Sequence, residues 1–260
     1  MKKLNLSFLK NITDEDKILL NQVADWAAAA ENKYISKYSF FLDERQSALC
    51  EQMLKSMTFS NYRFYGGHEG ADRNILCVYP DYSTAENNDF PINCLLFKYN
   101  KDYKLSHRDF LGSLMSLNIA RNTIGDIVVS NGRAQIYVYD KVCDLVLRDI
   151  SKIGRVGVTV QQNNIDPLRV SVEFEEISGT VSSLRLDCVL SLSLRISREK
   201  AKSIIMSKGI VLNHLMTYDA DTVLKDGDIF SIKGFGKYIF KSINGVSKKN
   251  RFHITLNKYV

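Results

Sequence analysis

Residues 197–213, Ser-Arg-Glu-Lys-Ala-Lys-Ser-Ile-Ile-Met-Ser-Lys-Gly-Ile-Val-Leu-Asn, carry the clearest structural signals in the chain. Ser197 is a favourable N-cap residue, and Gly209 stands where a glycine commonly ends a helix. The stretch therefore predicts a helix over 198–208, followed by a strand. At about 100° per residue, one face of this helix gathers three apolar residues: Ala201, Ile204 and Ile205.

Basic residues surround this predicted helix without matching acidic residues. Arg198 and Lys202 lie one turn apart on the flank of the apolar face, and Lys208 lies at the helix end. Arg185 and Arg195 precede the helix. Because a guanidinium group can donate two parallel hydrogen bonds to a phosphate, we predict that these five residues bind RNA. Since Arg198 and Lys202 only flank the apolar face, we expect the fold to survive their replacement.

The net charge of the chain is concentrated around this stretch. Residues 181–260 contain 14 Lys and Arg against 6 Asp and Glu, a net charge of +8. Residues 1–180 contain 21 Lys and Arg against 23 Asp and Glu, a net charge of −2. This asymmetry is typical of one basic module that binds a polyanion, joined to a body with another task.

The neighbouring residues complete a module over 181–260. A short helix precedes the quoted stretch, and a turn at 225–228 leads into a hairpin, so we predict two helices followed by a small bent hairpin. The run 233–240 resembles the aromatic RNP1 signature of the RNA-recognition motif (RRM), although Lys237 and Tyr238 break that signature. We predict a kinked basic strand whose Lys233 and Lys237 contact phosphate.

Residues 75–180 predict an RRM-like α/β plait. Asn131-Gly132 between two β-type runs is a strong hairpin signal, and Ser106 is a candidate N-cap. Helices packed on an antiparallel or mixed sheet follow from the alternation of elements. The expected strands are 75–79, 92–99, the two arms of 127–139, 156–161 and 168–175, and the expected helices begin after Ser106 and span 140–153.

Residues 1–74 predict a helical region. Thr13 can cap a first helix, and a second helix begins at Asp43 and ends near Met57. The apolar run 38–42 leads into this second helix. The predicted fold class is therefore α+β: an N-terminal helical region, a central plait and a basic C-terminal module, with boundaries near residues 74 and 180.

Composition excludes several classes of protein. No run approaches the roughly eighteen apolar residues of a membrane span. The five cysteines are scattered and never spaced as C-x-x-C, which indicates reduced thiols in a cytoplasm and neither disulfides nor a zinc site. The four histidines lie far apart in the sequence. We predict a cytoplasmic protein with no metal, cofactor, membrane partner or small-molecule substrate.

One triplet leaves an enzyme open as an alternative. Arg185-Leu186-Asp187 resembles the Arg-Leu-Asp of pseudouridine synthases, in which the Asp is the nucleophile. Those enzymes continue with a Thr/Ser-Gly pair, whereas here residues 188–191 continue a helix. Asp187 is expected to form a salt bridge or a cap.

Together, these segments resemble a known family. Residues 183–187, 196–201, 208–213 and 226–228 are similar to an S4 RNA-binding domain, which places two helices against a small bent sheet. The rest of the chain resembles the YlmH-type S4-domain proteins, in the family's order. The segments that carry this second resemblance are Phe41-Leu42-Asp43, residues 64–73 (Phe-Tyr-Gly-Gly-His-Glu-Gly-Ala-Asp-Arg), residues 79–82, residues 107–112 (His-Arg-Asp-Phe-Leu-Gly) and residues 121–127 (Arg-Asn-Thr-Ile-Gly-Asp-Ile).

The resemblance implies a non-enzymatic, ribosome-associated protein. Family members bind the large ribosomal subunit together with peptidyl-tRNA and assist ribosome quality control, and an older association is with cell division. Ribosomal RNA of the large subunit and tRNA are thus the expected partners, with an RNA-modifying enzyme or a cell-division interaction protein as alternatives. The resemblance gives RNA contacts to Arg185, Arg198, Lys202 and Lys208. We expect weak auxiliary contacts from three arginines of the plait: Arg108, Arg121 and Arg133.

Overall fold

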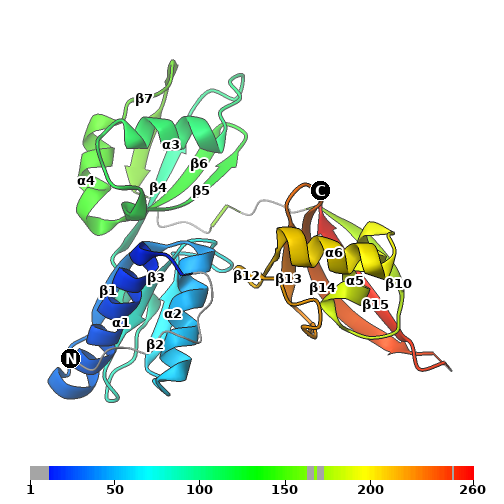
Figure 1. The fold of residues 1–260 in the computed structure, drawn as a ribbon. Coiled ribbons are helices and arrows are strands. Elements are labelled where there is room, and N and C mark those ends of the chain that lie inside the picture. The colour runs from blue at the N-terminus through cyan, green and yellow to red at the C-terminus, as the bar shows by residue number, and fades with distance from the viewer. Residues whose placement is uncertain (1–11, 163–166, 169–172, 248) are drawn as a thin grey trace. The chain divides into compact units, whose positions relative to one another are not determined.

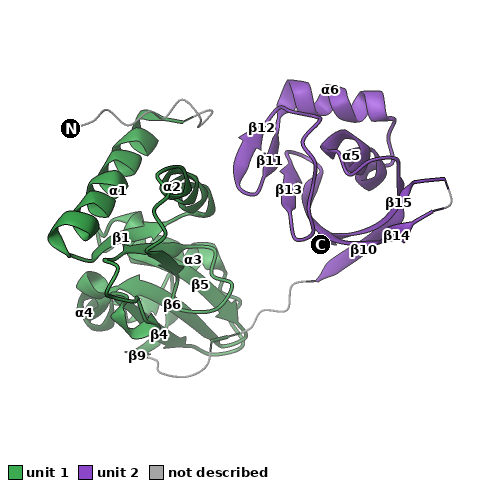
Figure 2. Ribbon diagram, turned by 90° about the horizontal axis from the view of Figure 1, so that it is seen from below, with its two compact units in different colours: residues 1–170 green, residues 171–260 purple. Residues whose placement is uncertain are grey.

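The computed structural model describes residues 12–162, 167–168, 173–247 and 249–260. This part of the chain contains six α-helices and several antiparallel sheets (Figure 1), so the predicted α+β class is confirmed. The chain divides into two compact units, Met1–Val170 and Ser171–Val260 (Figure 2). Independent folding of residues 1–74 and 75–180 stays a prediction.

Two helices and a three-stranded sheet form the first part of unit 1. Both helices begin at capping boxes: the Thr13 side chain accepts a hydrogen bond from the N–H of Asp16, and Asp43 accepts one from the N–H of Gln46. The helices contact the sheet, whose strand order is β1-β3-β2. The elements are α1 (Asp14–Lys33), β1 (Lys37–Leu42), α2 (Glu44–Ser56), β2 (Tyr62–Tyr65) and β3 (Asn74–Val78).

Strand β3 differs from the expectation, which assigned it to the central plait. It pairs instead with β1 and β2. Strand β1 itself was not predicted, because its apolar run 38–42 was expected only to lead into the second helix. The last four residues of β3, 75–78, are fully buried, so the strand needs neighbours at both edges and cover on both faces. The predicted boundary near residue 74 therefore falls at the start of a central strand.

The second part of unit 1 is the RRM-like plait. Its elements follow the order β-α-β-β-α-β, and its sheet has the antiparallel order β5-β6-β4-β9. Helices α3 and α4 pack on one face of the sheet and share its apolar core. The elements are η1 (Asn87–Asp89), β4 (Ile92–Lys98), α3 (His107–Met115), η2 (Arg121–Thr123), β5 (Ile124–Ser130), β6 (Arg133–Tyr139), α4 (Asp140–Asp149) and β9 (Thr159–Gln162).

Helix α4 is shorter than the predicted span 140–153. It ends at Asp149 because Ile150 is extended, and the next residues form a small hairpin of β7 (Lys152–Ile153) and β8 (Val156–Gly157). Gly154, with a positive φ of 58°, permits the turn between these strands.

Unit 2 packs two helices against an antiparallel sheet of order β10-β15-β14-β13-β11-β12. Ala201 and Ile205 of the predicted apolar face are buried in a core shared with the sheet. The sequence predicts both helices and one hairpin, but it misses β12 and β15. Of the expected strand 168–175, residues 169–172 lie outside the described residues. The elements are β10 (Phe174–Val181), α5 (Leu186–Leu194), α6 (Arg198–Lys208), β11 (Ile210–Leu212), β12 (Leu215–Thr217), β13 (Ile229–Ile232), β14 (Gly236–Val246) and β15 (Phe252–Tyr259).

Candidate nucleic-acid interface

A buried carboxylate organises the arginines at the start of α6. Asp187, in the first turn of α5, has a side chain that is 1% exposed. Arg198 Nε lies 2.8 Å from one of its carboxylate oxygens, and Arg185 Nη2 lies 3.2 Å from the same oxygen. Arg185 also pairs with Asp221. The predicted salt bridge of Asp187 is therefore present, and its carboxylate is engaged rather than free as a nucleophile.

The protonation of this cluster follows from its contacts. Burial by itself would raise the pKa of Asp187, but hydrogen bonds from Arg198, Cys188 and Arg185 outweigh burial and lower the pKa. The hydrogen bond to Asp187 also raises the pKa of Arg198. At neutral pH, two guanidinium groups therefore face two carboxylates when Asp221 is included.

This pairing corrects one expectation from the sequence. Arg185 and Arg198 do have acidic partners. Both pair with the buried Asp187, and Arg185 also pairs with Asp221, which is distant in the sequence. The Arg198 side chain remains 51% exposed, so it can still reach a phosphate. However, it also neutralises a buried charge, and replacing it by an acid would place like charges against each other.

A groove of about 360 Å³ beside these arginines gathers further positive charge. Arg195, Arg198 and Arg251 line it, together with residues of β10 and α5. Arg251 Nη2 donates to the carbonyl oxygen of Thr180 at 3.0 Å. No carboxylate in the described part of the chain pairs with Arg195 or Arg251. Arg251 was not predicted from the sequence, although it ends the basic run 248–251.

Two predicted lysines of α6 are exposed. Lys202 is one turn beyond Arg198, and Lys208 ends the helix. The Lys208 Nζ lies 5.7 Å from the ring centroid of Phe235, and both residues line a groove of about 600 Å³ with Lys233. The structure therefore brings Lys208 and Lys233 together.

The RNP1-like run does not present a stacking surface. Tyr238 and Phe240 are 2% and 0% exposed, and Tyr238 stacks on Phe230 inside the core. Lys237 is half-buried, with its Nζ 5.2 Å from the ring centroid of Tyr259. Base stacking along this strand is therefore blocked, while the exposed Phe235 remains accessible beside Lys208.

The three auxiliary arginines of the plait lie apart. Arg108 is exposed in the first turn of α3, and Arg133 is exposed at the start of β6, directly opposite Lys98 of β4. Like charges that face each other across strands repel, so this pair favours a bound anion. Arg121 is half-buried, and its Nη1 lies 2.6 Å from the carbonyl oxygen of Ile124.

The described residues form neither a cluster of metal ligands nor a membrane-spanning helix. No group of three or more His, Cys, Asp and Glu residues among them could hold a metal ion. None of the described helices combines the length and the apolar character that a membrane crossing requires.

Comparisons with known proteins agree with these features. Residues 85–167, which include the plait, match the family model "Putative RNA-binding domain in YlmH". The chain is 29% identical over 250 residues to the ribosome-associated protein quality control protein P2 of Bacillus subtilis, covering 94% of this chain and 95% of that protein. The solved structure of the cell division protein ylmH from Streptococcus pneumoniae is similar with a TM-score of 0.51 and 26% identity. It covers 60% of this chain and 98% of its own.

Proposed function

Because this chain belongs to the YlmH-type RNA-binding proteins, we propose that it docks on the large ribosomal subunit through the basic side of unit 2. Ribosomal RNA is the main partner in this proposal, and peptidyl-tRNA is the second. The protein would act in the cytoplasm and assist ribosome-associated protein quality control, the process in the name of the Bacillus relative.

The observation that carries the proposal is a set of cations that the fold leaves unneutralised. They lie on or beside α6, and the described residues offer none of them a carboxylate partner. Phosphate contacts of this kind supply most of the affinity of RNA-binding proteins and tolerate many sequences. We call these residues the α6 basic surface: Arg195, Lys202, Lys208, Lys233 and Arg251.

We propose that the protein has no catalytic activity of its own. The resemblance to pseudouridine synthases depends on Asp187, and that carboxylate is 1% exposed and held by two arginines. A nucleophile needs access to its substrate, which this position does not provide. Arg108 and Arg133 would add weak contacts from the plait, while Arg121 is turned to a backbone carbonyl.

A pair of charge reversals on one helix tests the proposal. Lys202→Glu lies on the α6 basic surface, whereas Lys200→Glu changes an exposed lysine on the opposite side of α6. We expect Lys202→Glu to weaken co-sedimentation of the full chain with purified large subunits, and Lys200→Glu to leave it near wild type. Equal binding by both variants, or equal binding of the wild-type chain to large and small subunits, would refute the proposal.

A further inference from the structure

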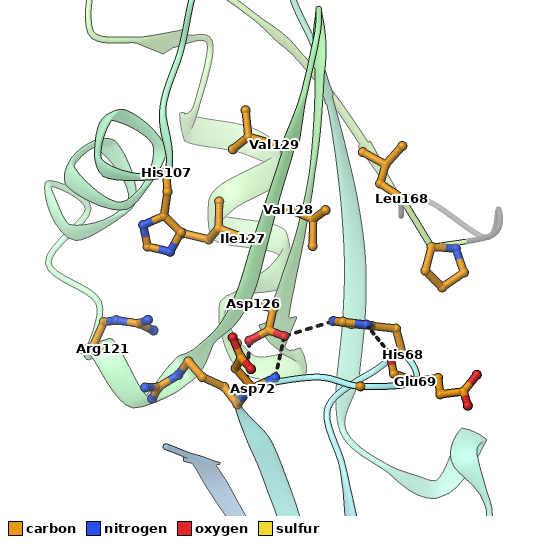
Figure 3. Close-up of a pocket in the computed structure, with 14 residues that line it drawn as sticks. His68, Glu69, Asp72, His107, Arg121, Asp126, Ile127, Val128, Val129 and Leu168 are labelled. Carbon is orange, nitrogen blue, oxygen red and sulfur yellow. Dashed lines mark hydrogen bonds and ion pairs between the residues drawn. The ribbon is translucent and has the colours of Figure 1, made fainter. Parts of the chain in front are cut away.

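A pocket of about 1020 Å³ in unit 1 has no role in the function proposed above. Figure 3 shows its walls, which come from the loop after β2, the start of α3, η2 and strand β5. Three segments that carry the family resemblance, in 64–73, 107–112 and 121–127, therefore meet at one place although they are distant in the sequence.

The pocket runs along the open edge of β5. Five consecutive residues of this strand, 125–129, line it. Successive side chains of a strand point to opposite faces, so a pocket that touches all of them must follow the edge. Strand β5 is the first in the order β5-β6-β4-β9, and among the described residues no backbone-to-backbone hydrogen bond joins 125–129 to a segment other than β6.

The hydrogen-bond register shows which backbone groups face the pocket. Ser130 and Arg133 flank a two-residue turn and are paired, so they form a hydrogen-bonded pair. Because such pairs alternate along an antiparallel ladder, Val128 bonds to β6, whereas Ile127 and Val129 direct their N–H and C=O groups away from β6. The pocket therefore offers donors and acceptors at the spacing of a β-strand.

The wall opposite this edge is held in place by Asp126. Its carboxylate accepts hydrogen bonds from His68 Nε2 at 3.0 Å, the Asp72 N–H at 2.9 Å and the Arg73 N–H at 3.1 Å (Figure 3). Arg73 is fixed in turn, since it donates to the carbonyl oxygens of Ile124 and Phe41. The pocket is thus formed before any partner binds.

The charges of the lining favour a peptide over RNA. Two arginines, Arg73 and Arg121, are accompanied by three carboxylates, Glu69, Asp72 and Asp126. A surface without net positive charge lacks the main source of RNA affinity. Arg121 donates to the carbonyl oxygen of Ile124, and no described carboxylate pairs with it, so its remaining donors suit one acidic group.

We propose that the open edge of β5 binds an extended peptide segment of a partner protein as an added strand. Alternate residues of the segment are apolar and contact Val128 and Leu168 on one face of the sheet (Figure 3), and one carboxylate of the segment pairs with Arg121. Main-chain hydrogen bonds to Ile127 and Val129 hold the segment. Its apolar contacts, together with the pairing of its acidic residue with Arg121, make the binding specific.

Selection of peptides by the full chain tests this site. The probe is a phage-displayed library of nine-residue peptides with valine or isoleucine at alternate positions and the other positions random. We expect enrichment of peptides with Asp or Glu at one fixed position. A synthetic copy of an enriched peptide is then N-methylated at every second amide, in two complementary versions. Only the version that blocks the amides facing β5 should lose binding.

Two substitutions locate the binding on the protein. Val129→Pro removes an N–H that faces the pocket and makes no bond to β6, so the strand should persist, as edge strands accept proline. We expect this substitution to weaken the affinity for the peptide by about 5- to 10-fold, the effect of losing one hydrogen bond. Arg121→Gln should weaken the binding of the acidic peptide. It should not weaken the binding of the same peptide with Asn or Gln in place of its Asp or Glu.

Several outcomes would overturn the proposal. These are no enrichment over the random library, equal loss of binding for both methylated peptides, or displacement of the peptide by a decauridylate RNA. The Lys202→Glu variant should bind the peptide as the wild type does, since Lys202 lies in unit 2. A failure of ribosome binding and a failure of peptide binding are therefore separable.

Discussion

At the scale of single residues, Asp187 links the fold of unit 2 to its arginines. Asp187→Asn removes a buried negative charge that two guanidinium groups share. We expect a loss of about 1–3 kcal/mol in the free energy of unfolding of unit 2, measured by urea denaturation. Asp221→Asn is the matched control, because Asp221 also pairs with Arg185 but is 62% exposed. An exposed pair contributes about 0–1 kcal/mol. Equal effects of the two substitutions would contradict this role of Asp187.

His68 makes unit 1 sensitive to pH. Its hydrogen bond to Asp126 raises its pKa above the ordinary value of 6.5, although burial acts in the opposite direction. A raised pKa in the folded state means that the stabilisation is complete below pH 6.5 and is lost as the pH rises through the folded-state pKa. We expect the ring resonances of His68 in NMR spectra to titrate above pH 6.5, and to titrate at lower pH in Asp126→Asn. Identical titration curves in the two proteins would show that Asp126 does not control this proton.

The sequence was informative about residue types and less so about their partners. Helical spacing places Arg198 and Lys202 beside the apolar face of α6, and a salt bridge or a cap was expected for Asp187. The pairing of Arg185 with Asp221 was not predicted, since 36 positions separate them and only the folded loop brings them together. Arg251 was missed for a similar reason: it directly precedes β15, whose pairing with β10 brings it to the groove beside Arg198, and that strand was not predicted.

At the scale of elements, helix α6 ends as its sequence predicts. Gly209 has φ of 72° and ψ of 163°, a conformation that essentially only glycine adopts. A Cβ there would lie 2.6 Å from the Met216 sulfur and 3.0 Å from the Tyr218 ring. Gly209→Ala should therefore lower the free energy of unfolding by about 1–3 kcal/mol, measured by thermal denaturation.

Gly112→Ala is the control for that substitution. Gly112 lies inside α3, and a Cβ there meets nothing within 4 Å. Alanine should raise helix stability by about 0.5–1 kcal/mol at such a position. A neutral effect of Gly209→Ala would show that the end of α6 is less constrained than its backbone angles indicate.

Helices and hairpins were predictable because their signals are local. The capping residues Thr13, Asp43, Ser106 and Ser197 all precede helices where expected. Strands β1, β3 and β15 were misassigned or missed, because their partners lie far along the chain and a short apolar run does not specify which sheet it joins. The pocket along β5 could not be predicted either, since it exists only where three distant segments meet.

At the scale of the whole molecule, the two compact units should separate on proteolysis. Residues 163–173 connect β9 to β10, and unit 2 has its own core. Limited trypsin digestion, followed by mass spectrometry, should yield a stable basic fragment that begins at Val170, because Arg169 is the one trypsin site between Arg155 and Arg185. The modular account is wrong if cleavage occurs only at the chain ends, or if residues 171–260 expressed alone do not fold.

The salt dependence of ribosome binding tests the central claim most directly. Each phosphate contact contributes a slope of roughly −0.7 to −0.9 in a log–log plot of affinity against salt. Affinity for purified large subunits is measured by co-sedimentation over a series of KCl concentrations, with folding checked by circular dichroism.

Three proteins are compared in this measurement. Lys202→Gln combined with Lys208→Gln removes two charges of the α6 basic surface without touching Asp187, whereas Lys200→Gln combined with Lys225→Gln removes two exposed charges outside it. We expect a slope shallower by about 1.5 for the first variant and an unchanged slope for the second. Equal slopes for all three proteins would contradict the claim that this surface binds ribosomal RNA.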